Sequence, residues 1–190
     1  MKNILGPAIL IMGLLGQALP ARADFITTTT LSGATELAGT GSSGTGTLTL
    51  QYNSSLQQLN YNLVFSGLSS SATIAQLHYG TPGQTGAVLF TLFNLGMPPN
   101  QSLTAGAFSG TLTRLNLETD TTDGINSFTD AINAIATDKT YVNVQTVGDP
   151  NGEIRGNLLP NPEPASVGLV GGSFLLAGLG LLRRRSNSSH

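Results

Sequence analysis

Cysteine and tryptophan are absent from this chain of 190 residues, and charged residues make up only 9% of it. Without cysteine there are no disulfides, no thiolate metal ligands and no Cys–His catalysis. One of the two histidines is the C-terminal residue, so a Ser–His–Asp arrangement would have to centre on His78. Neither a Gly-x-Ser-x-Gly turn nor a phosphate-binding glycine loop is present. We therefore expect a protein that is not an enzyme and needs no cofactor.

Basic residues are also scarce between residues 24 and 159. This region has nine acidic residues against three basic ones, a net charge of −6. Such a balance argues against nucleic acid as a partner. Its 136 residues are enough for one domain with its own core.

The N-terminus has the three parts of a secretory signal peptide. Lys2 provides the positive charge, residues 4–19 form an uncharged apolar stretch, and Ala21 and Ala23 give a small-x-small cleavage site. We expect signal peptidase to remove residues 1–23. A permanent N-terminal anchor is the alternative, but glycine and proline interrupt the short apolar stretch.

The last 31 residues combine three elements in order: a proline-bounded signature (Pro162, Glu163, Pro164), an uncharged run (167–182) and a basic stop (Arg183, Arg184, Arg185). As a helix the 16-residue run is about 24 Å long, against a bilayer core of about 30 Å. The arginines place the C-terminus in the cytoplasm. We expect a marginal transmembrane helix and a type I membrane intermediate; a buried glycine-rich core helix is the alternative.

This tail resembles a PEP-CTERM sorting signal in all three elements. The resemblance implies a bacterial protein processed by a membrane-embedded exosortase. It also implies delivery to the cell surface or the extracellular space, often alongside exopolysaccharide and biofilm production. A sortase signal would need LPxTG, which is absent, and a GPI signal would lack the arginines.

Between these signals the sequence predicts eight short strands with turns between them. Alternating polar and apolar residues, bounded by Gly, Pro, Asn and Ser, indicate strands at 25–31, 47–52, 59–65, 73–79, 87–93, 107–113, 141–147 and 153–158. Turn residues at 53–55 and 148–152 predict two antiparallel hairpins. The pattern favours an antiparallel β-sandwich or barrel.

Within the third strand the alternation also predicts which side chains are buried. Leu59, Leu63 and Phe65 share a face with Tyr61, whereas Asn60 and Asn62 point to the other face. We expect the first set in the core and the asparagines in water.

One segment has helical periodicity instead. Phe128, Ala131, Ile132 and Ile135 lie on one helical face, and Ser127 with Asp130 resembles a capping box. We expect one short crossover helix at about 127–136.

Three blocks of the domain resemble the CHRD family, named from chordin, over roughly residues 25–159. They are Leu31-Ser32-Gly33-Ala34-Thr35-Glu36; Gly67-Leu68 with Ala75-Gln76-Leu77-His78-Tyr79-Gly80; and Tyr141-Val142-Asn143-Val144-Gln145-Thr146 leading to Pro150-Asn151-Gly152-Glu153-Ile154-Arg155-Gly156. The resemblance implies an immunoglobulin-like β fold. The parent animal protein handles extracellular signalling ligands, and bacterial members have no settled activity.

The chain departs from this family at its histidines. The family often has histidine at the positions of Gln76, His78 and Gln145, a layout that resembles copper/zinc superoxide dismutase. Glutamine is a poor ligand for such metals. We expect a vestigial site in which these side chains meet. It is either a hydrogen-bonded cluster between strands or a weak transition-metal site.

Two sets of charged residues are further candidates. Glu118, Asp120 and Asp123 carry oxygens on one loop, as in calcium sites, but lack the full EF-hand spacing. A solvated acidic loop is the alternative. Glu153 and Arg155 share a strand face, and we expect them to pair with each other or across strands.

Two function classes remain open. The first is a non-catalytic cell-surface or extracellular-matrix protein, with a polar face for polysaccharide or protein. The second is a metal-dependent or redox enzyme with a degraded histidine site, which Gln76 and Gln145 argue against.

Overall fold

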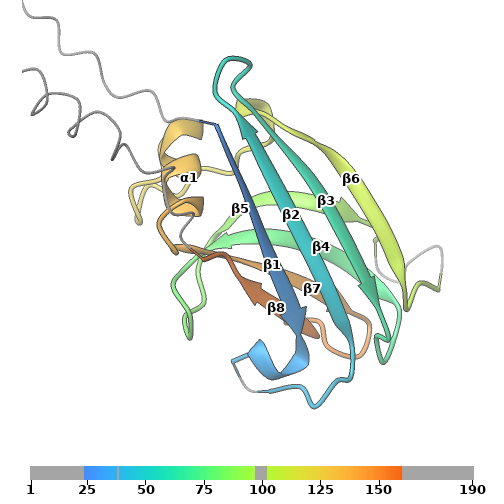
Figure 1. Ribbon diagram of the computed structural model, residues 1–190. Helices are drawn as coiled ribbons and strands as arrows, with labels where there is room; N and C mark the ends of the chain where they lie inside the picture. The colour runs from blue at the N-terminus through green and yellow to red at the C-terminus, as the bar shows by residue number, and fades with distance from the viewer. Residues whose placement is uncertain (1–23, 38, 97–101, 160–190) are drawn as a thin grey trace, which may run out of the picture.

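Eight antiparallel strands and one α-helix make up the part of the chain that the computed structural model describes, residues 24–37, 39–96 and 102–159 (Figure 1). The strands are β1 (Phe25–Ser32), β2 (Thr45–Asn53), β3 (Gln58–Ser66), β4 (Ala72–Tyr79), β5 (Val88–Asn94), β6 (Gly106–Leu112), β7 (Thr140–Thr146) and β8 (Ile154–Asn157). The helix is α1 (Phe128–Ile135), and two 3₁₀ turns are η1 (Gly33–Thr35) and η2 (Arg114–Asn116). All nine predicted elements are confirmed, each end within two residues.

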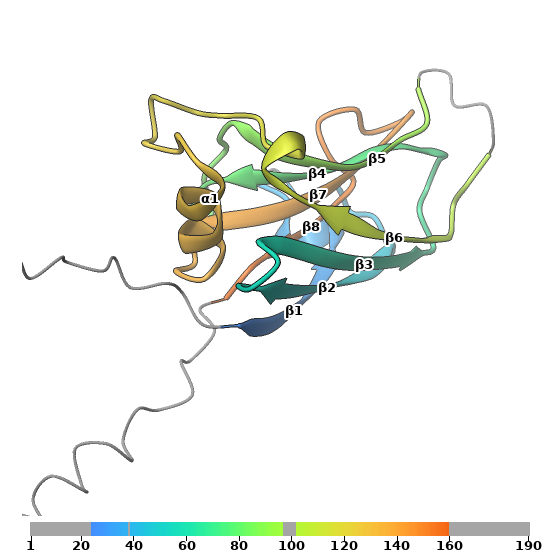
Figure 2. The same ribbon diagram turned by 90° about the horizontal axis from the view of Figure 1, so that it is seen from above.

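The eight strands form one sheet in the order β5-β4-β7-β8-β1-β2-β3-β6. The sheet curls into two facing layers (Figure 2), and its edge strands approach each other. Phe93 of β5 stacks on Phe108 of β6 with ring centroids 4.1 Å apart, and the Tyr61 hydroxyl donates to the Leu92 carbonyl at 2.5 Å. The fold is therefore a nearly closed barrel. An immunoglobulin-like sandwich has two separate sheets, whereas here β1 pairs with both β2 and β8.

Alternating residues of the strands fill the barrel. Leu59 and Leu63 have no exposed surface and Phe65 is 2% exposed, while Asn60 and Asn62 are exposed, as predicted. Both predicted hairpins are confirmed: β2 pairs with β3, and β7 with β8. Hydrophobic burial drives this arrangement, because the apolar set of each strand faces the same interior.

Helix α1 closes one end of the barrel, beside the start of β1 (Figure 1). Phe128 packs against Tyr52 and Phe90, with ring centroids 6.4 and 6.0 Å away. The Ser127 side chain caps the helix by accepting from the backbone N–H of Asp130. The Ser127 half of the predicted capping box is confirmed, whereas the Asp130 carboxylate accepts from the backbone of Asn126 and not from that of Ser127. The packing of Phe128 stabilises a helix too short to persist alone.

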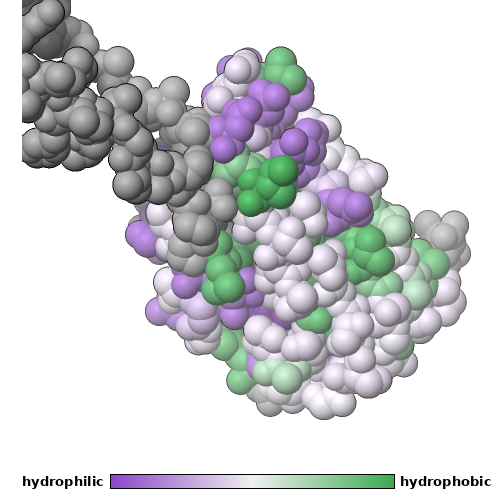
Figure 3. Space-filling model, viewed as in Figure 1, coloured by the Kyte–Doolittle hydropathy of each residue, from purple (hydrophilic) through white to green (hydrophobic). Residues whose placement is uncertain are grey.

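The outer face of β1, β2 and β3 is weakly polar. Figure 3 shows it mostly as intermediate in hydropathy, with isolated hydrophobic residues. Hydroxyls on this face bond to one another, as between Thr28 and Thr49 at 3.1 Å. Such a face is compatible with water.

Strand β7 differs, because it is covered on both faces. Val142 and Val144 enter the core, while Tyr141 and Asn143 point to the opposite face and are still only 3% and 5% exposed. Loops on the outer face cover these side chains and enclose the space described next.

Candidate functional site

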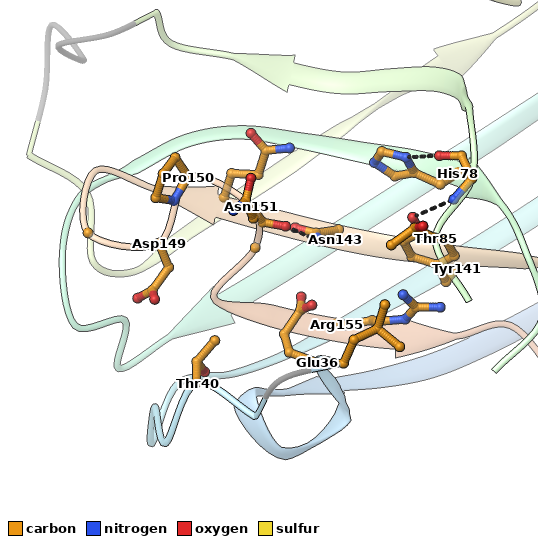
Figure 4. Close-up of a pocket in the computed structure, with 15 residues that line it drawn as sticks. Glu36, Thr40, His78, Thr85, Tyr141, Asn143, Asp149, Pro150, Asn151 and Arg155 are labelled. Atoms are coloured by element: carbon orange, nitrogen blue, oxygen red, sulfur yellow. Dashed lines mark hydrogen bonds between the residues drawn. The ribbon is translucent and has the colours of Figure 1, made fainter. Parts of the chain in front are cut away.

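A cleft of about 680 Å³ lies on the outer face of β4, β7 and β8 (Figure 4). Three segments from distant parts of the sequence form its walls: Glu36, Leu37 and Thr40 after η1, residues 85–86 before β5, and the 148–152 turn between β7 and β8. The floor consists of side chains from the three strands. The volume is within the range of small-molecule sites.

Three stacked side chains form the floor, one from each strand. The His78 ring lies parallel to the Tyr141 ring, with centroids 4.8 Å apart and planes 6° from parallel. The Arg155 guanidinium carbon is 3.4 Å from the centre of the same Tyr141 ring. Because β4 and β8 flank β7, the two groups reach Tyr141 from opposite sides. Stacking on an aromatic face suits a planar guanidinium.

Arg155 is 1% exposed, and its guanidinium donates hydrogen bonds to the backbone of a loop. Its Nη2 donates to the carbonyls of Gln84 at 2.8 Å and Thr81 at 3.5 Å, and its Nε donates to Asn157 at 3.2 Å. Burial lowers the pKa of Arg155, partly offset by Tyr141 and Glu36. The residue thus fixes the 81–84 loop beside the cleft.

The geometry around His78 defines its tautomer. Its Nδ1 lies 3.1 Å from the carbonyl oxygen of Gly86, and because a carbonyl only accepts, Nδ1 carries the hydrogen. Burial lowers the pKa of His78, and the charge of Arg155 adds to this shift. The ring is therefore neutral at pH 7, with Nε2 an acceptor.

Three buried acceptor atoms of the cleft have no hydrogen-bond partner in the protein. They are His78 Nε2, Asn143 Oδ1 and Glu36 Oε1. The Asn143 amide nitrogen donates to the Asn151 carbonyl at 3.0 Å, which fixes the orientation of its oxygen. Burial raises the pKa of Glu36, against the opposing effect of Arg155. Buried polar atoms without partners are rare and costly.

Gly152 packs against Glu36 Oε1 and the amide group of Asn143. Its φ of +130° is unfavourable for other residues. A Cβ there would overlap the Asn143 amide and lie 2.6 Å from Glu36 Oε1. The 148–152 turn therefore packs directly on the cleft floor.

Of the three residues predicted to meet, only the two glutamines do so. Gln145 Nε2 donates to Gln76 Oε1 at 3.4 Å, and Gln76 Nε2 donates to Thr91 at 3.2 Å. The glutamines thus link β7, β4 and β5. His78 lines the same cleft but pairs with Tyr141, four residues along β7 from Gln145, or about 13 Å along the strand.

No metal-binding group of three histidine, aspartate or glutamate side chains occurs in residues 24–37, 39–96 and 102–159. Of the calcium candidates, Asp120 and Asp123 lie together in one turn, and Glu118 contacts β5 instead. Glu118 accepts from Thr91 at 3.4 Å, whereas Asp120 accepts from the backbone of Thr122 and Asp123 within a turn. The hydrogen bond with Asp120 raises the pKa of Asp123. These carboxylates stabilise the loop locally, a geometry that favours the alternative of a solvated acidic loop.

The expected pairing of Glu153 with Arg155 is also corrected. Although both are buried, Glu153 Oε1 accepts from the Ser42 hydroxyl at 2.6 Å and from the backbone of Ser69. Burial would raise the pKa of Glu153, but these hydrogen bonds lower it below its usual value. Arg155 binds the 81–84 loop instead, and the two side chains stabilise different segments.

Three cleft residues were not predicted as a site: Glu36, Tyr141 and Asn143. Each lies in one of the three sequence blocks that resemble the CHRD family, and this resemblance is the signal in the sequence that points to these residues. Alternation places Tyr141 and Asn143 on one face with Gln145. The position of Glu36 opposite them depends on the strand order.

The sorting signals lie outside the described residues. These are the cleavage site at Ala21 and Ala23, the signature Pro162, Glu163 and Pro164, the run 167–182, and Arg183, Arg184 and Arg185. Within the described part, no helix has the length and apolar character to cross a membrane.

Comparison with known proteins identifies one family. The CHRD domain model matches residues 27–158, and these include the strands and loops that form the cleft. No curated protein and no solved structure matches the chain. Since the match covers more than half of its length, the chain belongs to the CHRD domain family.

Proposed function

We propose that this chain is an exported, non-catalytic protein of the cell surface or extracellular matrix, whose CHRD domain binds an extracellular polysaccharide or protein in the cleft. The observation that carries the proposal is the set of buried acceptors without partners at the cleft, on His78, Asn143 and Glu36. A folded domain tolerates such atoms where a ligand satisfies them.

The surroundings of His78 favour binding over catalysis. A histidine that activates a nucleophile lies within hydrogen-bond reach of a hydroxyl. Among the described residues, the His78 ring contacts the Gly86 carbonyl through Nδ1, and Nε2 has no partner. Stacking on Tyr141 holds the ring in this orientation.

Export rests on the sequence. Signal peptidase would cleave after Ala23, and an exosortase would recognise Pro162, Glu163 and Pro164 while the 167–182 helix and its arginines hold the chain in the membrane. Exosortase sorting places the domain in the setting of exopolysaccharide and biofilm.

Surface retention of polysaccharide tests the proposal. In the native host we expect the protein in the surface or extracellular fraction, with bound exopolysaccharide. Thr85 is an exposed residue of the cleft wall, so Thr85→Trp should fill the cleft and release the bound material. Ser109→Trp, at an exposed position of edge strand β6, is the matched control and should retain it. A cytoplasmic protein, or equal binding by both variants, would contradict the proposal.

A further inference from the structure

The chemistry of the cleft selects among extracellular ligands. All three atoms without partners accept hydrogen bonds: the neutral imidazole nitrogen of His78, the amide oxygen of Asn143 and a carboxyl oxygen of Glu36. They come from β4, β7 and the segment after η1. A ligand that satisfies them must bring several donors close together.

The cleft carries charges of both signs. Arg155 contributes a positive charge, and Glu36 and Asp149 contribute negative ones; Arg155 lowers the pKa of Glu36 and Asp149 raises it. An anionic ligand would face the three acceptors, one of them on the Glu36 carboxylate, and the carboxylate of Asp149. A cationic ligand would be repelled by Arg155, which is only 1% exposed, so that water screens its charge little. The site therefore suits a neutral ligand rich in donors.

Stacking contributes little to recognition on the cleft floor. Both faces of Tyr141 are covered, one by His78 and the other by Arg155. A ligand is held there by hydrogen bonds, which favour groups such as hydroxyls at fixed spacing.

We propose that the cleft binds a neutral saccharide unit, whose hydroxyl groups donate to His78 Nε2, Asn143 Oδ1 and Glu36 Oε1. This inference rests on the proposed function and names the ligand class of the same site. Gly152 of the 148–152 turn packs against Glu36 Oε1 and the Asn143 amide, so the turn moves outward as the hydroxyls enter. The hydrogen bond from Asn143 to Asn151 then gives way.

Saturation-transfer NMR on the purified full chain tests this ligand class. The probes are neutral gluco-, manno- and galacto-oligosaccharides, oligouronates as anions, and glucosamine oligomers as cations. We expect saturable binding of at least one neutral series, and weaker or no binding of the charged ones.

Glu36→Gln turns one carboxyl oxygen of the site into an amide and leaves Arg155 uncompensated. We expect affinity for the neutral probe to fall about tenfold, the loss of one charge-assisted hydrogen bond, and binding of oligouronates to rise. Asp24→Asn removes the same charge from an exposed residue outside the cleft and should change neither.

The outcomes separate the ligand class from the function. Preferential binding of oligouronates or glucosamine oligomers by the native chain would overturn the neutral-saccharide inference and leave a binding function intact. The neutral-saccharide inference would also be overturned if no neutral probe bound while host polysaccharide bound to the native chain and not to Thr85→Trp. If neither the host polysaccharide nor any probe binds to the native chain, both proposals are overturned.

Discussion

At the scale of single residues, Tyr141 organises the site by holding His78 and Arg155 against its ring. The stack keeps His78 neutral, because burial and the charge of Arg155 both lower its pKa. A lowered pKa in the folded state means that the unfolded chain binds the proton more tightly. The neutral ring thus contributes stability above about pH 6.5, the unfolded value, and this contribution is lost as the pH falls through the folded value.

His78→Phe should therefore alter the pH dependence of stability. Phenylalanine keeps a flat ring against Tyr141 but does not titrate. We expect the free energy of unfolding of the native chain to decrease relative to the variant between pH 7 and pH 5. Urea denaturation at each pH measures it. Parallel curves for the two proteins would contradict the account.

Restoring the histidines of the family pattern gives a second prediction at this scale. Gln145 Nε2 lies 3.4 Å from Gln76 Oε1, whereas His78 pairs with Tyr141, four residues along β7 from Gln145. In Gln76→His with Gln145→His, we therefore expect at most two imidazoles to share a zinc ion, and His78 to take no part. Thermal scans of the double variant with and without zinc, before and after adding His78→Phe, measure it. A rise in Tm with zinc that His78→Phe abolishes would refute this strand register.

At the scale of elements, successive residues of strand β3 alternate between the core and the surface. Phe65 is 2% exposed and stacks on Phe93 and Phe108. We expect Phe65→Ala to destabilise the domain by about 3–5 kcal/mol, as for other aromatic core truncations. Asn62→Ala, on the exposed face of the same strand, should cost less than about 0.5 kcal/mol. Equal losses in chemical denaturation would show that the strand register is wrong.

The elements could be predicted because their signals are local. Period-two alternation in β2 and β3 and the spacing of Phe128, Ala131, Ile132 and Ile135 each depend on a few neighbouring residues. The site, by contrast, depends on contacts between residues that are far apart in the sequence. Its walls meet because β4, β7 and β8 are adjacent and β1 ends beside β8, an order that alternation does not encode. For the same reason the prediction that Arg155 pairs with Glu153 is wrong. Arg155 donates to the carbonyl of Gln84, which is 71 residues away in the sequence.

At the scale of the whole molecule, the two ends of the sequence predict processing. The mature protein should lack residues 1–23 and the segment beyond Pro164, and mass spectrometry of protein from the native host measures this. Replacing Arg183, Arg184 and Arg185 together with serine should weaken retention before cleavage, because these charges fix the orientation of the segment. An intact Arg183–His190 peptide in released material would count against it.

The central claim is that the cleft around His78, Tyr141 and Arg155 binds an extracellular ligand without transforming it. The most direct measurement is NMR on the isotope-labelled full chain in detergent micelles, titrated with polysaccharide secreted by its host. The account predicts shifts confined to His78, Asn143, Glu36 and the 148–152 turn, with the polysaccharide unchanged in length afterwards. Shifts on another face, or shortened polysaccharide, would contradict it.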